Sequence, residues 1–266
     1  MATYEILARA LAYPFPRPRT SIAIVGDWVV ELSKLDPQDL AACLVRADGT
    51  ETTLADICED AGVPEAAMGG RRTAVLAYGS NASPAGLGWK FPEERNAVVP
   101  LVRGSMRDLD VVYSSHIAVY GSVPATLQSS AGTQVETFVA LLTDAQLELV
   151  AGWEINATYE TVEVDLSLEL GDPPKEVGAF LSRHGCLTAQ GSEIAVADVA
   201  ATGRRFTAMT QPDVLEYVRS AVAPDVSLDD FVVRNVRDYE LARAYTAELR
   251  STATPFRGSR RGDSNP

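Results

Sequence analysis

The stretch 74–81 constrains the fold of this chain more than any other, because it is a short apolar segment that ends in a glycine turn. Its first five residues are small or apolar, the pattern of a buried strand. Gly79, Ser80 and Asn81 end this strand, and Ser83-Pro84 follows with a favoured N-cap and a proline at the first helical position. A strand, a tight turn and a helix N-terminus present backbone N–H groups to an anion. We therefore expect a carboxylate-binding loop at 79–81.

The composition excludes several classes of protein. The 266 residues carry a net charge of −13, which repels nucleic acid and anionic membrane surfaces. No apolar run approaches the roughly 20 residues of a membrane-spanning helix, and the N-terminus lacks the order of charges of a secretory signal. We expect a cytoplasmic protein that binds a small molecule carrying a carboxylate, with neither nucleic acid nor membrane as a partner.

The cysteines and histidines are too few and too scattered for a metal centre. The chain has three cysteines, Cys43, Cys58 and Cys186, and two histidines, His116 and His184. No spacing is typical of zinc ligands, and an odd number of widely separated cysteines is typical of reduced, buried thiols. The sequence predicts no metal and no cofactor.

Short strands dominate the middle of the chain. We expect strands at 74–78, 97–103, 109–114, 117–121, 135–142, 158–166 and 176–181, separated by turns. Ahead of them we expect a helix at 3–12, a hairpin at 21–31, a strand at 41–46 and a helix at 53–61. Further helices are predicted at 145–152, 211–222 and 237–250. Many short strands with few helices favour an α+β architecture with a closed or nearly closed sheet.

Several further segments carry a family resemblance. The order Tyr78-Gly79-Ser80-Asn81 resembles the signature of the γ-glutamylcyclotransferase-like proteins. Gly121–Leu127 is similar to the Gly-x-x-Ala-Thr strand that follows in that family, and Ser129–Val135 to its short glycine turn. Glu154 then falls where the family carries its catalytic glutamate. The resemblance covers roughly residues 73–182.

The resemblance implies a fold and a domain layout. The fold is a small mixed β-barrel with flanking helices, here with N- and C-terminal extensions. On this basis we expect residues 1–72 to form an extension packed on the core. Residues 73–250 would be the γ-glutamylcyclotransferase-like domain with its C-terminal helices, and residues 251–266 a disordered tail.

The resemblance also implies a reaction, in which the α-amine of a γ-glutamyl compound attacks its own side-chain carbonyl. 5-Oxoproline forms and the amine leaves. One carboxylate in a partly apolar pocket can take the proton from the amine and return it to the leaving group, and Glu154 is predicted to do so. Tyr78, Gly79, Ser80 and Asn81 are predicted to bind the substrate, with Tyr159 as a further donor.

Other interpretations of the same residues stay open. The chain could bind a carboxylate without turnover, since Ile155 stands where the family has glycine after its glutamate, or could cleave a different amide. Ser80 and Asn81 could be turn residues only, Glu154 a solvated carboxylate and Tyr159 an ordinary strand residue.

The remaining polar residues have simpler structural interpretations. His116 is expected to be a structural histidine at a strand end. His184 and Cys186 could form a nucleophilic pair if their side chains came within hydrogen-bond reach, although no third orienting group is evident. Asp108, Asp110 and Glu136 are most simply solvated or edge charges.

Overall fold

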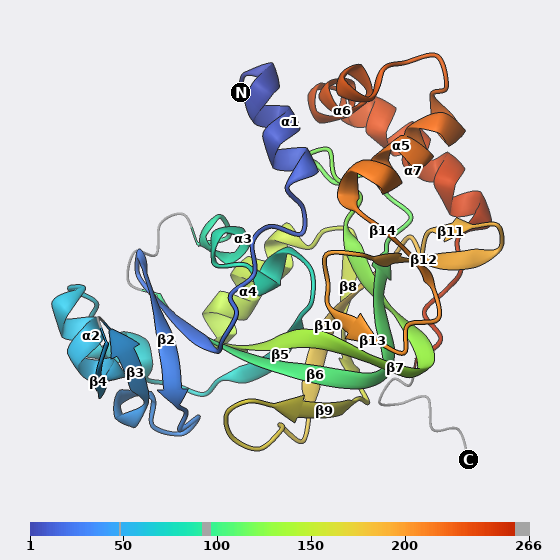
Figure 1. The fold of residues 1–266 in the computed structure, drawn as a ribbon. Helices are drawn as coiled ribbons and strands as arrows, with labels where there is room; N and C mark the ends of the chain where they lie inside the picture. Colours follow the sequence, from blue (N-terminus) through green and yellow to red (C-terminus); the bar gives the residue numbers. More distant parts are fainter. Residues whose placement is uncertain (48, 92–96, 259–266) are drawn as a thin grey trace.

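The computed structural model describes residues 1–47, 49–91 and 97–258, which form one extended sheet with helices around it (Figure 1). The helices are α1 (Thr3–Leu11), α2 (Leu54–Asp60), α3 (Pro84–Gly88), α4 (Asp144–Trp153), α5 (Gln211–Val222), α6 (Leu228–Arg237) and α7 (Tyr239–Leu249). Short 3-10 turns lie at Leu40–Ala42, Glu65–Met68, Ser80–Ala82 and Arg250–Thr252. No helix in these ranges is long and apolar enough to span a membrane.

The strands make up the larger part of the fold. They are β1 (Ile22–Val25), β2 (Trp28–Lys34), β3 (Leu44–Ala47), β4 (Thr50–Thr53), β5 (Thr73–Ala77), β6 (Val98–Tyr113) and β7 (Ala125–Leu142) in the first half. The second half adds β8 (Ala157–Val162), β9 (Asp165–Leu168), β10 (Val177–Ser182), β11 (Thr188–Ala189), β12 (Ser192–Val196), β13 (Ala201–Thr202) and β14 (Thr207–Met209). The mixture of sheet and helix agrees with the predicted α+β class.

The sheet is open, so the expected closed barrel is wrong. Its main path runs β4-β3-β2-β1-β6-β7-β5-β10-β8, and in the described residues the end strands β4 and β8 do not pair with each other. All neighbours on this path are antiparallel except β5 and β10. The long β6–β7 hairpin forms the centre, and β9, β12 and β13 attach along its length. Because β1 pairs with β6, the N-terminal hairpin extends the sheet outward, and no strand in the described ranges returns to close it.

Several predicted boundaries also differ from the structure. The strands expected at 97–103 and 109–114 are one strand, β6, with a register shift between Arg107 and Leu109 where Asp108 has a φ of 58°. The strand expected at 117–121 is a loop, in which Gly121 turns with a φ of 86°. Helix α6 lies outside the predicted helices. Within the predicted tail, Thr254 pairs with Cys186, and residues 259–266 lie outside the described residues.

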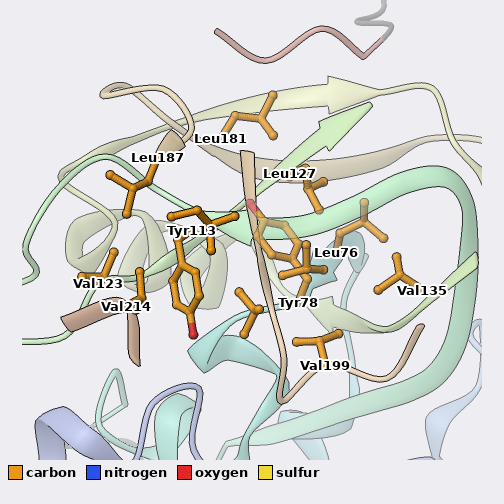
Figure 2. Packing of buried hydrophobic residues seen from close by; sticks show 14 of the residues in the cluster. Leu76, Tyr78, Tyr113, Val123, Leu127, Val135, Leu181, Leu187, Val199 and Val214 are labelled. Atoms are coloured by element: carbon orange, nitrogen blue, oxygen red, sulfur yellow. The ribbon is translucent and has the colours of Figure 1, made fainter. Parts of the chain in front are cut away.

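Three clusters of buried side chains hold these elements together. The largest lies around the β6–β7 hairpin and includes Leu76, Tyr78, Tyr113 and Leu127 (Figure 2). It extends to α1, α5 and α6, which gather at one end of the sheet (Figure 1). A second cluster forms beneath α3 and α4, and a third packs α2 on the N-terminal hairpin. The second cluster fixes the loop after β5 against α4, which is where the candidate site lies.

Candidate active site

The loop after β5 is short and tightly packed. Ser80–Ala82 forms a 3-10 turn, and α3 begins at Pro84 with Ser83 as N-cap, as predicted, although the Ser83 side chain makes no capping hydrogen bond. Gly86 in α3 lies directly against this turn: a Cβ built on it would be 2.0 Å from the Ser80 carbonyl oxygen. Only glycine permits that approach, so α3 and the turn are fixed relative to each other.

Glu154 contacts two residues of the loop and helix region. It is the C-cap of α4, and its Oε1 accepts a hydrogen bond of 3.0 Å from Asn81 Nδ2. Lys90 Nζ lies 2.5 Å from the same oxygen and 2.6 Å from Asn81 Oδ1. The Lys90 side chain is almost entirely buried, whereas that of Glu154 keeps 25% of its surface exposed. The three residues form a compact polar triad, which we call the Glu154 triad.

The Glu154 triad adjoins a cavity of about 360 Å³, the Glu154 cavity. Glu154, Lys90 and Ser80 contribute polar groups to its wall. Aromatic side chains supply much of the remaining wall, namely Phe15, Trp89, Tyr120, Trp153 and Phe180. An ion pair in such an environment attracts charged groups more strongly than it would in bulk water. The predicted acid and Ser80 of the predicted loop thus line one cavity, whereas Gly79 and Asn81 do not line it.

Tyr78, like Gly79, does not line this cavity. Tyr78 is buried in the largest core cluster (Figure 2), and its hydroxyl donates a hydrogen bond to the Phe180 carbonyl oxygen. Burial raises the pKa of Tyr78, so it remains a neutral phenol. Gly79, the first residue of the loop, packs against the Tyr13 side chain, where a Cβ would be 2.5 Å from the hydroxyl oxygen.

Tyr159 is also outside the cavity wall. Its ring packs beside Phe180 with centroids 5.3 Å apart, and its hydroxyl lies over Gly178 of the neighbouring strand. A Cβ on Gly178 would be 2.1 Å from that hydroxyl oxygen. The structure therefore places Tyr159 in a packing position on β8 and β10.

The N-terminal segment contributes residues that sequence reasoning missed. The Tyr13 hydroxyl accepts a 2.6 Å hydrogen bond from the Ala125 amide, and burial raises the pKa of this phenol. Arg9 stacks over Trp89, 4.1 Å from the ring centroid, and Phe15 packs edge-on against the same indole. Nothing in the local sequence links these residues with a loop more than 60 positions away. Tertiary contacts alone bring these residues to the candidate site.

The structure supports the structural role predicted for His116 but not the nucleophilic pair of His184 and Cys186. His116 Nδ1 is hydrogen-bonded to Ser114 Oγ at 2.6 Å, as a structural histidine would be. The Cys186 thiol is buried and contacts the Leu127 carbonyl, and burial raises its pKa to about 12. Among the described residues His184 bonds Asn156 and shares no hydrogen bond with Cys186, so the nucleophilic pair is not formed. No group of three or more His, Cys, Asp or Glu side chains in that part of the chain could hold a metal.

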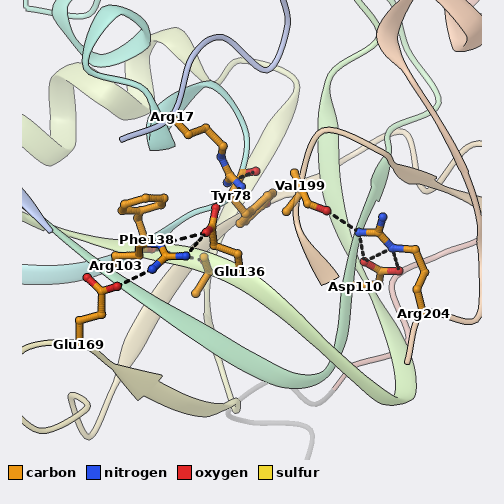
Figure 3. A network of polar contacts seen from close by, with 10 residues as sticks. Arg17, Tyr78, Arg103, Asp110, Glu136, Phe138, Glu169, Val199 and Arg204 are labelled. Atoms are coloured by element: carbon orange, nitrogen blue, oxygen red, sulfur yellow. Dashed lines mark hydrogen bonds and ion pairs between the residues drawn. The ribbon is translucent and has the colours of Figure 1, made fainter. Parts of the chain in front are cut away.

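Two predicted surface charges are structural instead (Figure 3). Asp110 is fully buried, and its carboxylate accepts hydrogen bonds from Arg204 at 3.0–3.3 Å. Glu136 bridges Arg17 and Arg103, and Arg17 also donates to the Tyr78 carbonyl oxygen at 2.9 Å. The solvated reading of these two acids is wrong, because each has an arginine partner from a distant part of the chain.

Comparisons with known proteins give little beyond this geometry. No protein-family profile matches the chain, and no curated protein matches it. Among solved structures, one described as a gamma-glutamyl cyclotransferase is similar over 71% of this chain and 93% of its own, with 13% sequence identity and a TM-score of 0.35. At that TM-score the likeness does not establish a shared fold or a shared activity.

Proposed function

We propose that the chain is a γ-glutamylcyclotransferase-like enzyme that cyclises a small γ-glutamyl amine or peptide to 5-oxoproline. One observation carries the proposal: Lys90 and Glu154 form an ion pair in the wall of a cavity rich in aromatic side chains. The α-amino acid end of a γ-glutamyl compound carries an ammonium beside a carboxylate. Such a zwitterion complements the pair, with its ammonium on Glu154 and its carboxylate on Lys90.

The proposed chemistry uses Glu154 as the proton carrier. Its carboxylate takes a proton from the α-ammonium, and the free amine attacks the γ-carbonyl carbon. The bond to the leaving nitrogen breaks as Glu154 returns the proton to that nitrogen. Glu154 then takes the second proton from the new ring nitrogen and passes it to the released amine, which departs as an ammonium, so two protons in all move from the α-nitrogen to the leaving nitrogen. Positioning supplies much of the rate, because attacking and attacked groups belong to one molecule.

The loop has a supporting role in this scheme. Asn81 donates to Glu154 and accepts from Lys90, so it holds both charged groups in a fixed orientation. Ser80 lines the same cavity and is the loop residue best placed to meet the substrate. Fixed groups of this kind need little reorganisation when charge moves during the reaction.

The test is release of 5-oxoproline from a panel of γ-glutamyl amines and dipeptides. The wild-type chain should release it, and Glu154→Gln should lower the rate by about 100-fold or more, since the amide cannot carry the proton. Glu148→Gln is the matched control, because Glu148 is an exposed acid of the same helix. Circular dichroism should show both variants folded. A fully active Glu154→Gln contradicts the proposal.

A second candidate function is carriage of a carboxylate ligand without turnover. It is favoured by the Lys90 contact, because Lys90 already engages the Glu154 carboxylate that would accept the substrate proton. In that case γ-glutamyl compounds should raise the melting temperature of the chain while mass spectrometry finds them unchanged.

A further inference from the structure

A second cavity, of about 220 Å³, lies beside the Glu154 cavity. Its wall includes His116, Asn156 and His184 together with Arg243, Thr246 and Arg250 from the C-terminal region. We call it the histidine–arginine cavity. His116 and Asn156 also line the Glu154 cavity, so the two spaces share part of a wall.

The charge around the histidine–arginine cavity is positive, although the chain as a whole is strongly acidic. Arg243 and Arg250 line the cavity, and burial, then the charges of Arg250 and Arg183, lower the pKa of His184. No acidic side chain among the described residues lines the cavity. Arg250 forms no ion pair within the described ranges, whereas Arg243 is paired with Glu240 on the surface. Arg250 therefore lacks a counterion in the described structure, and a bound anion would neutralise its charge.

The two histidines form the inner part of the cavity wall. Their rings lie 4.8 Å apart, and these are the only histidines of the chain. The His184 amide donates to Ser182 Oγ at 3.0 Å, and Ser182, Ser114 and His116 Nδ1 follow in a chain of 2.6 Å hydrogen bonds. If each hydroxyl donates onward, His116 Nδ1 accepts, and the neutral ring carries its proton on Nε2.

That assignment provides a hydrogen-bond donor without a partner. Nε2 of His116 has no hydrogen-bond acceptor among the described residues. His184 Nε2 donates to Asn156 Oδ1, so the unpaired Nδ1 of His184 is an acceptor and adds no donor to the site. The combination of a free N–H, an unpaired guanidinium and no carboxylate is the chemistry of an oxyanion site.

We propose that the histidine–arginine cavity binds an oxyanion, a carboxylate or a phosphate group. Arg250 supplies the charge at its outer side and His116 an N–H at its inner side. The site is separate from the Glu154 triad and does not depend on the proposed function, because none of its named groups takes part in the cyclisation.

Proton NMR can test this directly, because two histidines give two resolvable imidazole C2–H signals. We would titrate the full chain at constant pH 7 and ionic strength with inorganic phosphate and, in a separate arm, with acetate. At least one anion should shift the His184 or His116 signal in a saturable way. Arg250→Gln should weaken that binding about tenfold or more, and Arg250→Lys should retain part of it. The first arm reports a phosphate site and the second a carboxylate site.

The matched control is Arg234→Gln, which removes the same charge from an exposed arginine of α6 that does not line the cavity. It should leave the titration unchanged. The absence of a saturable shift with either anion would overturn the proposal, and so would equal weakening in the Arg234 and Arg250 variants. Failure of the cyclisation assay has no bearing on this result, so the two proposals are tested independently.

Discussion

At the scale of single residues, His116 gives this protein a defined response to acid. Burial, reinforced by the neighbouring His184 ring, lowers the pKa of His116 from 6.5 to about 3. As the pH falls below 6.5 the unfolded chain therefore binds a proton at this position that the folded chain does not. The stability that His116 contributes is complete above pH 6.5 and is lost progressively as the pH falls towards 3.

The expected size of this effect follows from the pKa difference. Between pH 7.5 and pH 5 the free energy of unfolding should fall by about 2 kcal/mol on account of His116. Urea denaturation at the two pH values measures the fall, and His116→Asn should reduce it by that amount while keeping a hydrogen-bonding group beside Ser114. If wild type and variant lose equal stability on acidification, His116 is not held neutral in the fold.

The site residues that the sequence predicts are those whose role shows in a short stretch of neighbouring residues. The glycine turn and the apolar surroundings of Glu154 are visible in short windows, and the structure places Ser80 and Glu154 on one cavity. No short stretch of sequence points to Lys90 or Tyr13, because their contacts at the site are with residues 64 and 112 positions away. Asp110 was misjudged for the same reason: an acid is exposed unless paired, and its arginine lies 94 positions along the chain.

At the scale of elements, the contact between α3 and the loop after β5 sets the position of Ser80. Alanine in place of a helical glycine normally stabilises a helix by about 1 kcal/mol. At Gly86 the sign should reverse, because the new Cβ would meet the Ser80 carbonyl. We expect Gly86→Ala to cost about 1–3 kcal/mol through this overlap.

Thermal or urea denaturation of two alanine variants provides the measurement. Gly88→Ala is the control, since Gly88 ends the same helix and a Cβ there has nothing within 4 Å. It should be neutral or mildly stabilising. Equal stability of the two variants would mean that α3 does not press on the turn as the structure indicates.

Elements were predictable where their sequence pattern and their packing agree. The strand before the glycine turn and helix α4 are examples. Helix α6 was missed because Val232, Val233 and Val236 are β-branched residues that favour strands. In the fold they form a helix because α6 packs against α1 and α5, and this tertiary contact outweighs local preference. The open sheet was missed because β1 pairs with β6, a pairing that no local pattern reports.

At the scale of the whole molecule, a set of four charged residues joins the N-terminal segment to the main sheet (Figure 3). Glu136 on β7 accepts from Arg17 and from Arg103 on β6, and Arg103 also pairs with Glu169. Arg17 is 8% exposed at its side chain and donates to the carbonyl of Tyr78, next to the candidate site. The network therefore connects the first 20 residues, the central hairpin and the start of the site loop.

Glu136→Gln tests how far the molecule depends on this connection. The variant leaves Arg17 and Arg103 facing a neutral amide, and Arg17 is buried. Removal of one partner from a buried ion pair is costly, because the other charge stays buried and unpaired. We expect a loss of about 2–4 kcal/mol in the free energy of unfolding, with faster hydrogen exchange in residues 12–19. Glu31→Gln is the matched control, because its pair with Arg46 is exposed on both sides and should contribute no more than about 1 kcal/mol. If the two variants are equally stable, the N-terminal segment is held by its apolar contacts alone, and the aromatic wall that it contributes to the Glu154 cavity does not depend on these charges.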